Sequence, residues 1–333
     1  MSPLFARKTT SHRGLALAKK HGEDLQSVKN RTSNISANDI LVFSTCRNER
    51  PRLSFFLDYY RRMGVGHFLF VENDSSDGTR EFLEVQQDCS VWTTRASYRD
   101  SNFGVHWLNA LAQCYGAKHW CLTLDPDEFL VFPYCDTRAL RDLLDFFDAE
   151  GKESLYTLLI DMYPRGAVED AKYCDGMDPI EVACWFDPAG YFQEKMPENH
   201  DWWVRGGVRR RVFFTDEPWN APALNKTPLV KWKKHFLYLS STHTVNPKRL
   251  NEPNFKDSLA PTGCLLHFKY LSLLQDKVQE EMLRKQHYAG SREYKRYAEL
   301  FEKKTNLWSE GSVQFKGWRQ LVDLGLMNVG RWF

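Results

Sequence analysis

An acidic turn is the strongest chemical feature of this 333-residue sequence. Asp125, Asp127 and Glu128 stand within four positions and directly follow a short apolar segment. Three carboxylates this close together repel one another, and a divalent cation such as Mg²⁺ or Mn²⁺ offsets that repulsion because it prefers hard oxygen ligands. A solvated turn can have the same composition, so the elements around the turn decide between a metal site and an ordinary loop.

Two further clusters of polar residues follow apolar segments in the same way. Their members are Arg47, Asn48 and Glu49 in the first cluster and Glu72, Asn73 and Asp74 in the second. Such side chains suit hydrogen bonds to a uracil edge, a ribose diol or a phosphate. Each cluster alone is also typical of helix caps and turns. Together with the acidic turn, the two clusters favour a nucleotide site.

The segments around these clusters alternate between strand and helix patterns. Short apolar runs rich in β-branched or aromatic residues predict strands at 39–46, 67–73, 91–96 and 119–132, the last one running into the acidic turn. Amphipathic stretches predict helices at 53–64, 74–87 and 103–117. This alternation indicates an α/β fold with a mostly parallel sheet flanked by helices, in which ligands bind at the carboxyl ends of the strands.

Three motifs occur in order along this region, namely STCRNE, VENDSSDGT and LDPDEF. Their succession resembles the family 2 glycosyltransferases of the GT-A fold, in particular a bacterial branch with the pattern RNE…DNDSxDGT…DxDEF. The similarity is clearest over residues 39–135 and weakens through residue 270. The resemblance implies a Rossmann-like, mostly parallel sheet flanked by helices, with a C-terminal helical extension.

The same resemblance implies a metal-dependent, inverting transfer of a sugar from a nucleotide sugar, usually a UDP-sugar, to a glycan or lipid-linked saccharide. It implies these roles: the nucleoside is bordered by Arg47, Asn48 and Glu49, uracil and ribose are recognised by Glu72, Asn73 and Asp74, the metal and the diphosphate are bound by Asp125 and Asp127, and the loop is braced by Glu128. Glu72 departs from the family pattern, which has Asp most often at this place. The product would be a surface polysaccharide or a glycolipid.

Two other hypotheses fit an acidic metal site on an α/β sheet. One is a sugar-phosphate nucleotidyltransferase, although the first strand lacks the glycine-rich phosphate loop of such enzymes. The other is a non-catalytic nucleotide-sugar or carbohydrate-binding protein, which would bind without turnover.

A metal held by the acidic turn needs further ligands, and two histidines are candidates. His243 in YLSSTHTV is the first, because GT-A enzymes often complete the site with a late histidine, and His267 in CLLHFKY is the alternative. An imidazole ligand favours Mn²⁺ slightly over Mg²⁺.

Inverting transfer also needs a carboxylate that accepts the proton of the acceptor hydroxyl. The candidates are Asp161 in LLIDMYP and three acids of FQEKMPENHDWW, namely Glu194, Glu198 and Asp201. We favour Glu198 or Asp201, because the adjacent Trp202 and Trp203 can stack on a sugar ring.

The segment Gly206-Gly207-Val208-Arg209-Arg210-Arg211 has two interpretations. Its backbone amides and guanidinium groups suit a phosphate or an acidic acceptor. Its alternation is equally typical of a half-exposed strand whose arginines face water.

Composition excludes several classes of protein. The 45 Lys and Arg against 43 Asp and Glu lack the basic excess of a phosphate-backbone binder, so nucleic acid is not an expected partner. The eight cysteines include no CxxC pair and predict reduced thiols. No apolar run reaches the roughly 20 residues of a membrane span or resembles a signal peptide, so we expect a cytoplasmic protein.

Domain boundaries follow from the same patterns. Residues 1–36 are basic, and their leucines are too sparse for a packed helix, so we expect a mobile arm or a weak amphipathic helix. This segment either solubilises the chain or contacts anionic lipids at the inner face of the membrane. We expect a GT-A domain at 37–270, with a donor half at 37–135 and an acceptor half at 136–270. The C-terminal helical extension is expected at 271–333.

Overall fold

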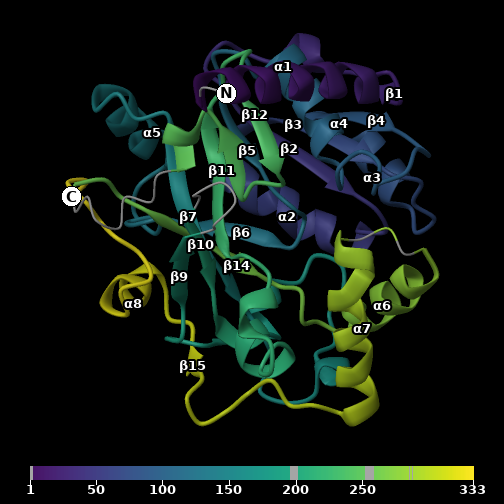
Figure 1. Cartoon of the computed structure of the whole chain (residues 1–333), viewed down its shortest axis with the longest axis vertical. Helices are drawn as coiled ribbons and strands as arrows, with labels where there is room; N and C mark the ends of the chain where they lie inside the picture. The colour runs from purple at the N-terminus through teal and green to yellow at the C-terminus, as the bar shows by residue number, and fades with distance from the viewer. Residues whose placement is uncertain (1–2, 196–201, 252–258, 285, 287) are drawn as a thin grey trace. The chain divides into compact units, whose positions relative to one another are not determined.

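The computed structural model describes residues 3–195, 202–251, 259–284, 286 and 288–333 (Figure 1). The chain forms two compact units. The first consists of Met1–Pro126, Ala139–Leu155 and Thr227–Glu252, and the second of Asp127–Arg138, Tyr156–Lys226 and Pro253–Phe333. The units alternate along the chain, so their bounds differ from the continuous segments expected from the sequence. One change of unit falls between Pro126 and Asp127, inside the acidic turn.

The first unit is built around a mostly parallel sheet. Its strands in spatial order are β1 (Gln26–Lys29), β4 (Cys89–Thr93), β3 (Val65–Glu72), β2 (Ile40–Cys46), β5 (Trp120–Thr123) and β11 (Asn225–Lys231, within this unit from Thr227 onward). The pairs β4–β3, β3–β2 and β2–β5 are parallel, whereas β1 and β11 pair antiparallel with their neighbours. A small hairpin is formed by β12 (Leu237–Ser240) and β13 (Thr244–Asn246). The predicted α/β fold with a mostly parallel sheet is confirmed.

Helices cover both faces of this sheet. They are α1 (Pro3–Gly22), α2 (Arg50–Arg62), α3 (Thr79–Val85), α4 (Val105–Leu111), continued by the π-helical turn η2 (Ala112–Gly116), and α5 (Leu140–Ala149). Successive side chains of a strand point to opposite faces. In β3, Phe68 and Phe70 contact Phe56 of α2, whereas Leu69 packs in one core with Trp107 of α4. Burial on both faces explains why the strands appear in the sequence as continuous apolar runs.

Helix α1 packs against α4 at the top of the view in Figure 1, which differs from the mobile arm expected from the sequence. Small residues four positions apart line the buried side of α1, which contacts both α4 and β12. Ala18 is fully buried, a Cβ atom on Gly14 would lie 2.8 Å from Cδ1 of Leu237, and one on Gly22 would lie 3.0 Å from Cβ of Ala110. The contact therefore depends on the absence of large side chains, which a search for spaced leucines does not detect.

The second unit has strands of its own. They are β6 (Glu128–Val131), β7 (Ser154–Asp161, within this unit from Tyr156 onward), β8 (Trp185–Phe186), β9 (Phe192–Lys195), β10 (Trp202–Arg205), β14 (Gly263–His267) and β15 (Val313–Gln314). Strand β14 lies between β7, with which it is parallel, and β6, with which it is antiparallel. This arrangement brings the ends of three strands together around His267.

Helices complete the second unit. They are the π-helical turn η5 (Arg209–Phe213), α6 (Leu273–Arg284), α7 (Tyr288–Lys303) and α8 (Trp318–Asp323). Helices α6 and α7 lie side by side in Figure 1. They share an aromatic core with η5, in which the Phe213 ring stacks on Tyr270 and meets Tyr297 edge to face. The arginine-rich segment is therefore helical at Arg209–Phe213, and the strand interpretation of it is wrong.

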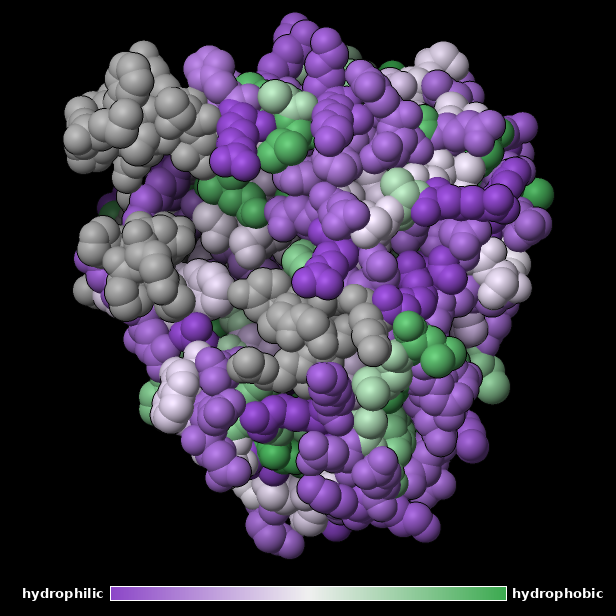
Figure 2. Space-filling view, turned by 45° about the vertical axis from the view of Figure 1, so that its right-hand side comes forward, coloured by the Kyte–Doolittle hydropathy of each residue, from purple (hydrophilic) through white to green (hydrophobic). Residues whose placement is uncertain are grey.

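The face in Figure 2 is mostly hydrophilic, with small hydrophobic areas between hydrophilic ones. Of the helices in the described part of the chain, none combines the length and the apolar character that a membrane span requires.

The docking of α1 can be tested by enlarging its buried small residue. We expect Ala18→Leu to lower the free energy of unfolding by about 1–3 kcal/mol, because the contact leaves no room for a larger side chain. Ala16→Leu is the matched control, since Ala16 is exposed on the same helix, and it should change stability by less than about 0.5 kcal/mol. Urea titration measures both variants, and equal effects would show that α1 does not pack in this way.

Candidate functional site

The carboxyl ends of β2 and β3 bring the first two polar clusters together in the first unit. Arg47 donates from Nη1 to the carbonyl oxygens of Asn73, at 2.6 Å, and Asp74, at 2.5 Å. Asn48 accepts at Oδ1 from the backbone N–H of Ser76 at 2.8 Å. The two loops therefore hold each other in place, as expected for neighbouring parallel strands.

Glu72 and Asn73 are buried and bond to the end of β4 and to loop residues beside it. The Glu72 carboxylate accepts from the Thr93 hydroxyl at 2.7 Å and from the backbone N–H of Ser75. Asn73 donates from Nδ2 to the carbonyl oxygens of Thr94, at 3.0 Å, and Ala96, at 3.2 Å. These contacts indicate that both side chains shape the loops.

Asp74 is the most accessible member of these clusters, with half of its side chain exposed, whereas the other members are partly or fully buried. Its backbone is left-handed, with φ of 58°, as is that of Asn48, with φ of 50°. Asn and Asp tolerate this conformation better than most residues. Arg47 approaches the Asp74 carboxylate at 3.5 Å. Arg95 lies closer still, with its Nε atom 3.2 Å from Oδ1 of Asp74. Asp74 is thus a half-exposed acid beside two arginines.

Asp125 belongs to the same end of the sheet. It follows β5, which is parallel to β2, and the N–H of Leu124 still donates to the carbonyl oxygen of Phe43 at 3.1 Å. The carboxyl ends of β2, β3 and β5 are therefore on one edge of the sheet, with Arg47, Asp74 and Asp125 following them.

In the second unit, Glu128 forms a buried ion pair with Lys226. The Lys226 ammonium donates to Oε1 of Glu128, and both side chains are at most 5% exposed. Glu128 is also directly opposite His267 in the β6–β14 register. A buried charge is stable only with a close partner, so this pair fixes the residue that follows Asp127.

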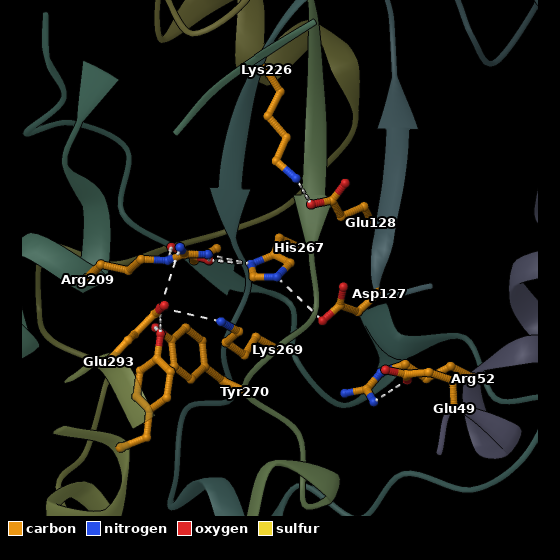
Figure 3. A network of polar contacts seen from close by, with 12 residues as sticks. Glu49, Arg52, Asp127, Glu128, Arg209, Lys226, His267, Lys269, Tyr270 and Glu293 are labelled. Atoms are coloured by element: carbon orange, nitrogen blue, oxygen red, sulfur yellow. Dashed lines mark hydrogen bonds and ion pairs between the residues drawn. The ribbon is translucent and has the colours of Figure 1, made fainter. Parts of the chain in front are cut away.

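His267 lies between two carboxylates in the second unit (Figure 3). Its Nδ1 is 2.6 Å from Oδ1 of Asp161, the residue opposite it on β7, and its Nε2 is 3.4 Å from Oδ2 of Asp127. Arg209 donates from Nε and Nη2 to the two oxygens of Asp161, both at 2.8 Å. We call these residues, with Lys269 and Glu293, the His267 network.

The proton of His267 is assigned from its neighbours. Nδ1 lies 2.6 Å from Asp161 Oδ1 and 2.9 Å from Nη2 of Arg209. A guanidinium can only donate, so a hydrogen bond from Nη2 needs Nδ1 without a proton, whereas the contact with the Asp161 carboxylate needs Nδ1–H. We assign the proton by the shorter contact, so that Nδ1–H donates to Asp161. In the charged ring, Nε2–H points to Asp127; in the neutral ring, Nε2 has the lone pair and lies 3.4 Å from that carboxylate.

Burial and charge act against each other in this network. Burial would lower the pKa of His267, but Asp127 and Asp161 outweigh it and raise that pKa. Burial would raise the pKa of Asp161, but Arg209 and His267 outweigh it and hold that pKa well below its usual range. Asp161 is therefore ionised, and both of its oxygens are hydrogen-bonded. It can orient His267, but it is poorly suited to accept a proton from a substrate.

Glu293 completes the network from helix α7. Its Oε1 is 3.6 Å from Nη1 of Arg209 and 3.4 Å from Nζ of Lys269, and it accepts from the Tyr297 hydroxyl. Burial would raise the pKa of Glu293, but Lys269 and Arg209 outweigh it and lower the pKa to about 2.

The other predicted site residues lie elsewhere or outside the described residues. His243 is in the turn between β12 and β13 of the first unit, and its role as a metal ligand stays a prediction. Glu198 and Asp201 lie outside the described residues, so they remain predictions as well. Glu194 of β9 pairs with Arg205 of β10, the neighbouring antiparallel strand, at 2.6 Å.

Two members of the network, Lys269 and Glu293, were missed by the sequence analysis. Glu293 occurs in a charged helical stretch, YAGSREYKRYAELFEK, whose other acids are ordinary surface residues by pattern. Lys269 follows His267 by two positions, and that proximity is the only signal in the sequence.

Asp127 and His267 are chemically suited to hold one small divalent ion. Among the described residues, no group of three or more His, Cys, Asp and Glu is arranged to hold a metal, and Asp127 and His267 would supply two of its donors. Two donors about 2.1 Å from one ion and roughly 90–110° apart lie about 3.0–3.4 Å from each other. The 3.4 Å between Nε2 and Oδ2 fits this separation.

Comparisons with known proteins leave the family open. No protein-family model matches the chain, and no curated protein matches it either. One similar solved structure is a protein from Bacillus anthracis named as a glucose-1-phosphate thymidylyltransferase, in complex with a sucrose. The two sequences are 7% identical, and the TM-score is 0.26. The matched region covers 40% of this chain and 61% of the other chain. A likeness this weak says nothing about activity.

The buried pair of Glu128 and Lys226 leads to a test of stability. We expect Lys226→Met or Glu128→Met alone to cost about 3–5 kcal/mol of unfolding free energy, because each leaves a buried charge without its partner. The double variant should cost at least about 2 kcal/mol less than the sum of the two.

The exposed pair of Lys303 and Glu299 is the control, where Lys303→Met should cost less than about 1 kcal/mol. Additive effects at Glu128 and Lys226 in urea titrations would show that the two charges do not stabilise each other.

Glu293 leads to a prediction about acid stability. Its pKa in the folded chain, about 2, lies below its ordinary value of 4.5, so its ionised form stabilises the fold above about pH 4.5. This contribution is lost as the pH falls toward 2. We expect Glu293→Gln to lose stability less steeply than the wild type between pH 5 and pH 2 in urea titrations. Identical slopes would contradict the assigned interactions of Glu293.

Proposed function

We propose that the chain is a metal-dependent, inverting glycosyltransferase that transfers a sugar from a nucleotide sugar to a glycan or lipid-linked saccharide. The observation that supports it most is the arrangement at one edge of the first unit's sheet, where Arg47, Asp74 and Asp125 follow three neighbouring parallel strands. This edge is where α/β sheets bind nucleotides. A UDP-sugar is the proposed donor because the three motifs resemble enzymes that use one.

The metal is proposed to bind at Asp127 and His267, with Mn²⁺ favoured over Mg²⁺ because one donor is an imidazole nitrogen. When bound, a divalent ion stabilises the negative charge that develops on the departing diphosphate. The chain supplies a carboxylate oxygen and a lone pair on Nε2, 3.4 Å apart. Asp125 is proposed to assist binding of the metal and the diphosphate, as the resemblance implies.

Donor and acceptor groups have separate proposed residues. Arg47 and Asp74 would contact the nucleoside, because Asp74 is half exposed and Arg47 partly exposed, while Glu72 and Asn73 are buried in loop contacts. The proton of the acceptor hydroxyl would go to Glu198 or Asp201. Asp161 is not proposed as the base, because Arg209 and His267 occupy both of its oxygens.

Calorimetric titration of the full chain with UDP, GDP, CDP and TDP, with and without Mn²⁺, tests the proposal. We expect UDP to bind in the presence of Mn²⁺ and Asp127→Asn to weaken that binding more than about 100-fold, since a bound metal contributes several kcal/mol to holding a diphosphate. Asp136→Asn is the matched control, because Asp136 is an exposed acid paired with Arg319, and it should bind like the wild type.

The outcomes separate the alternatives. Metal-independent UDP binding that Asp127→Asn leaves unchanged would contradict the metal site. Binding of TDP with exchange of pyrophosphate would favour the nucleotidyltransferase. No binding of any nucleotide by folded protein would exclude both enzymes.

A further inference from the structure

Glu293 contacts the cationic side of the His267 network, although it is 26 residues beyond His267 in the chain. Its side chain is 24% exposed, and its Oε1 atom contacts Nη1 of Arg209, Nζ of Lys269 and the hydroxyl of Tyr297. An acid that only solubilised helix α7 would face water, as Glu299 does. The position of Glu293 therefore calls for an explanation within the network.

The charges behind His267 balance only when Glu293 is included. Asp161 and Glu293 are negative, and Arg209 and Lys269 are positive, which leaves no net charge in these four residues. Without Glu293 they would carry one net positive charge, which would repel a divalent cation beside Nε2 of His267.

Glu293 also determines how Arg209 is oriented. The guanidinium is planar, and its Nε and Nη2 atoms bind Asp161 while Nη1 points to Glu293. Nη2 is already 2.9 Å from Nδ1 of His267. Nη2 is thus shared between Oδ1 of Asp161 and Nδ1. A guanidinium released at Nη1 can turn from Oδ1 toward Nδ1, which accepts only if the ring proton is on Nε2. In that tautomer Nε2 has no lone pair for a metal.

We propose that Glu293 is a positioning residue, which holds Arg209 on Asp161 and so keeps the His267 proton on Nδ1 and Nε2 available to a divalent ion shared with Asp127. This inference rests on the metal site of the proposed function. It deepens that function by making helix α7 part of the support of the site. Carboxylates that orient a metal-binding histidine through its second nitrogen are a general device of metal sites, and here the carboxylate is itself oriented, through Arg209, by Glu293.

Titration of the full chain with Mn²⁺ alone tests the proposal, since it needs no substrate and no turnover. We expect Glu293→Gln to raise the Kd for Mn²⁺ about 10- to 100-fold, the range found for residues that support metal ligands. Glu299→Gln is the matched control on the same helix, because Glu299 is exposed and pairs only with Lys303 in the contacts described, and its Kd should stay within twofold of the wild type.

A second comparison separates positioning from a general loss of structure. If Glu293 acts through His267, then Glu293→Gln should not weaken Mn²⁺ binding further in a His267→Gln background. Tyr297→Phe removes the hydroxyl that donates to Glu293 and keeps the charge, so it should raise the Kd by a smaller factor, about two- to fivefold. This variant carries the test if Glu293→Gln does not fold.

The outcomes distinguish this inference from the function beneath it. A wild-type chain that does not bind Mn²⁺ refutes the metal site and the inference together. Two outcomes refute the inference and leave the proposed function standing, provided that the wild type binds Mn²⁺. In the first, Glu293→Gln binds Mn²⁺ as well as the wild type. In the second, Glu293→Gln weakens Mn²⁺ binding as much in the His267→Gln background as in the wild type.

Discussion

Burying the carboxylate of Asp161 is unfavourable unless a cation accompanies it, and the bidentate pair with Arg209 meets this requirement. The second unit depends on this interaction in several ways. The pair requires a buried Arg209, and the helical turn η5 places the side chain in the interior. The same pair holds η5 next to β7 and β14. It also leaves Asp161 ionised beside His267, so that the histidine has a fixed orientation between two carboxylates.

The first unit has a different requirement. Loops after β2 and β3 must present polar side chains at a sheet edge without leaving their own backbone unpaired. Arg47 bonds to the backbone of the opposite loop, and Glu72 and Asn73 bond to adjoining loops. Asp74 is left accessible beside Arg47. Thus several motif residues stabilise the loops, and a smaller number face a ligand.

The parts of the fold that the sequence predicts are those set by local patterns. The strand and helix alternation at 39–132 follows from apolar periodicity, because both faces of the sheet are covered and its strands are apolar throughout. Helix α1 was expected as a mobile arm, since its contact depends on small residues such as Ala18, which periodicity does not register. The arginine-rich segment is ambiguous by pattern, and only the buried partner Asp161 decides its conformation. Glu293 is recognisable only once α7 is placed.

The position of the proton on the neutral ring of His267 tests most directly whether Nε2 can bind a metal. Long-range ¹H–¹⁵N spectra of the full chain, with the His267 signal identified by its loss in His267→Gln, distinguish the two ring nitrogens at a pH above the titration of the ring. We predict a proton on Nδ1, a bare Nε2, and a shift of the Nε2 signal with diamagnetic Cd²⁺ that Asp127→Asn abolishes. A proton on Nε2, or an Nε2 signal that does not respond to the metal, would contradict the account.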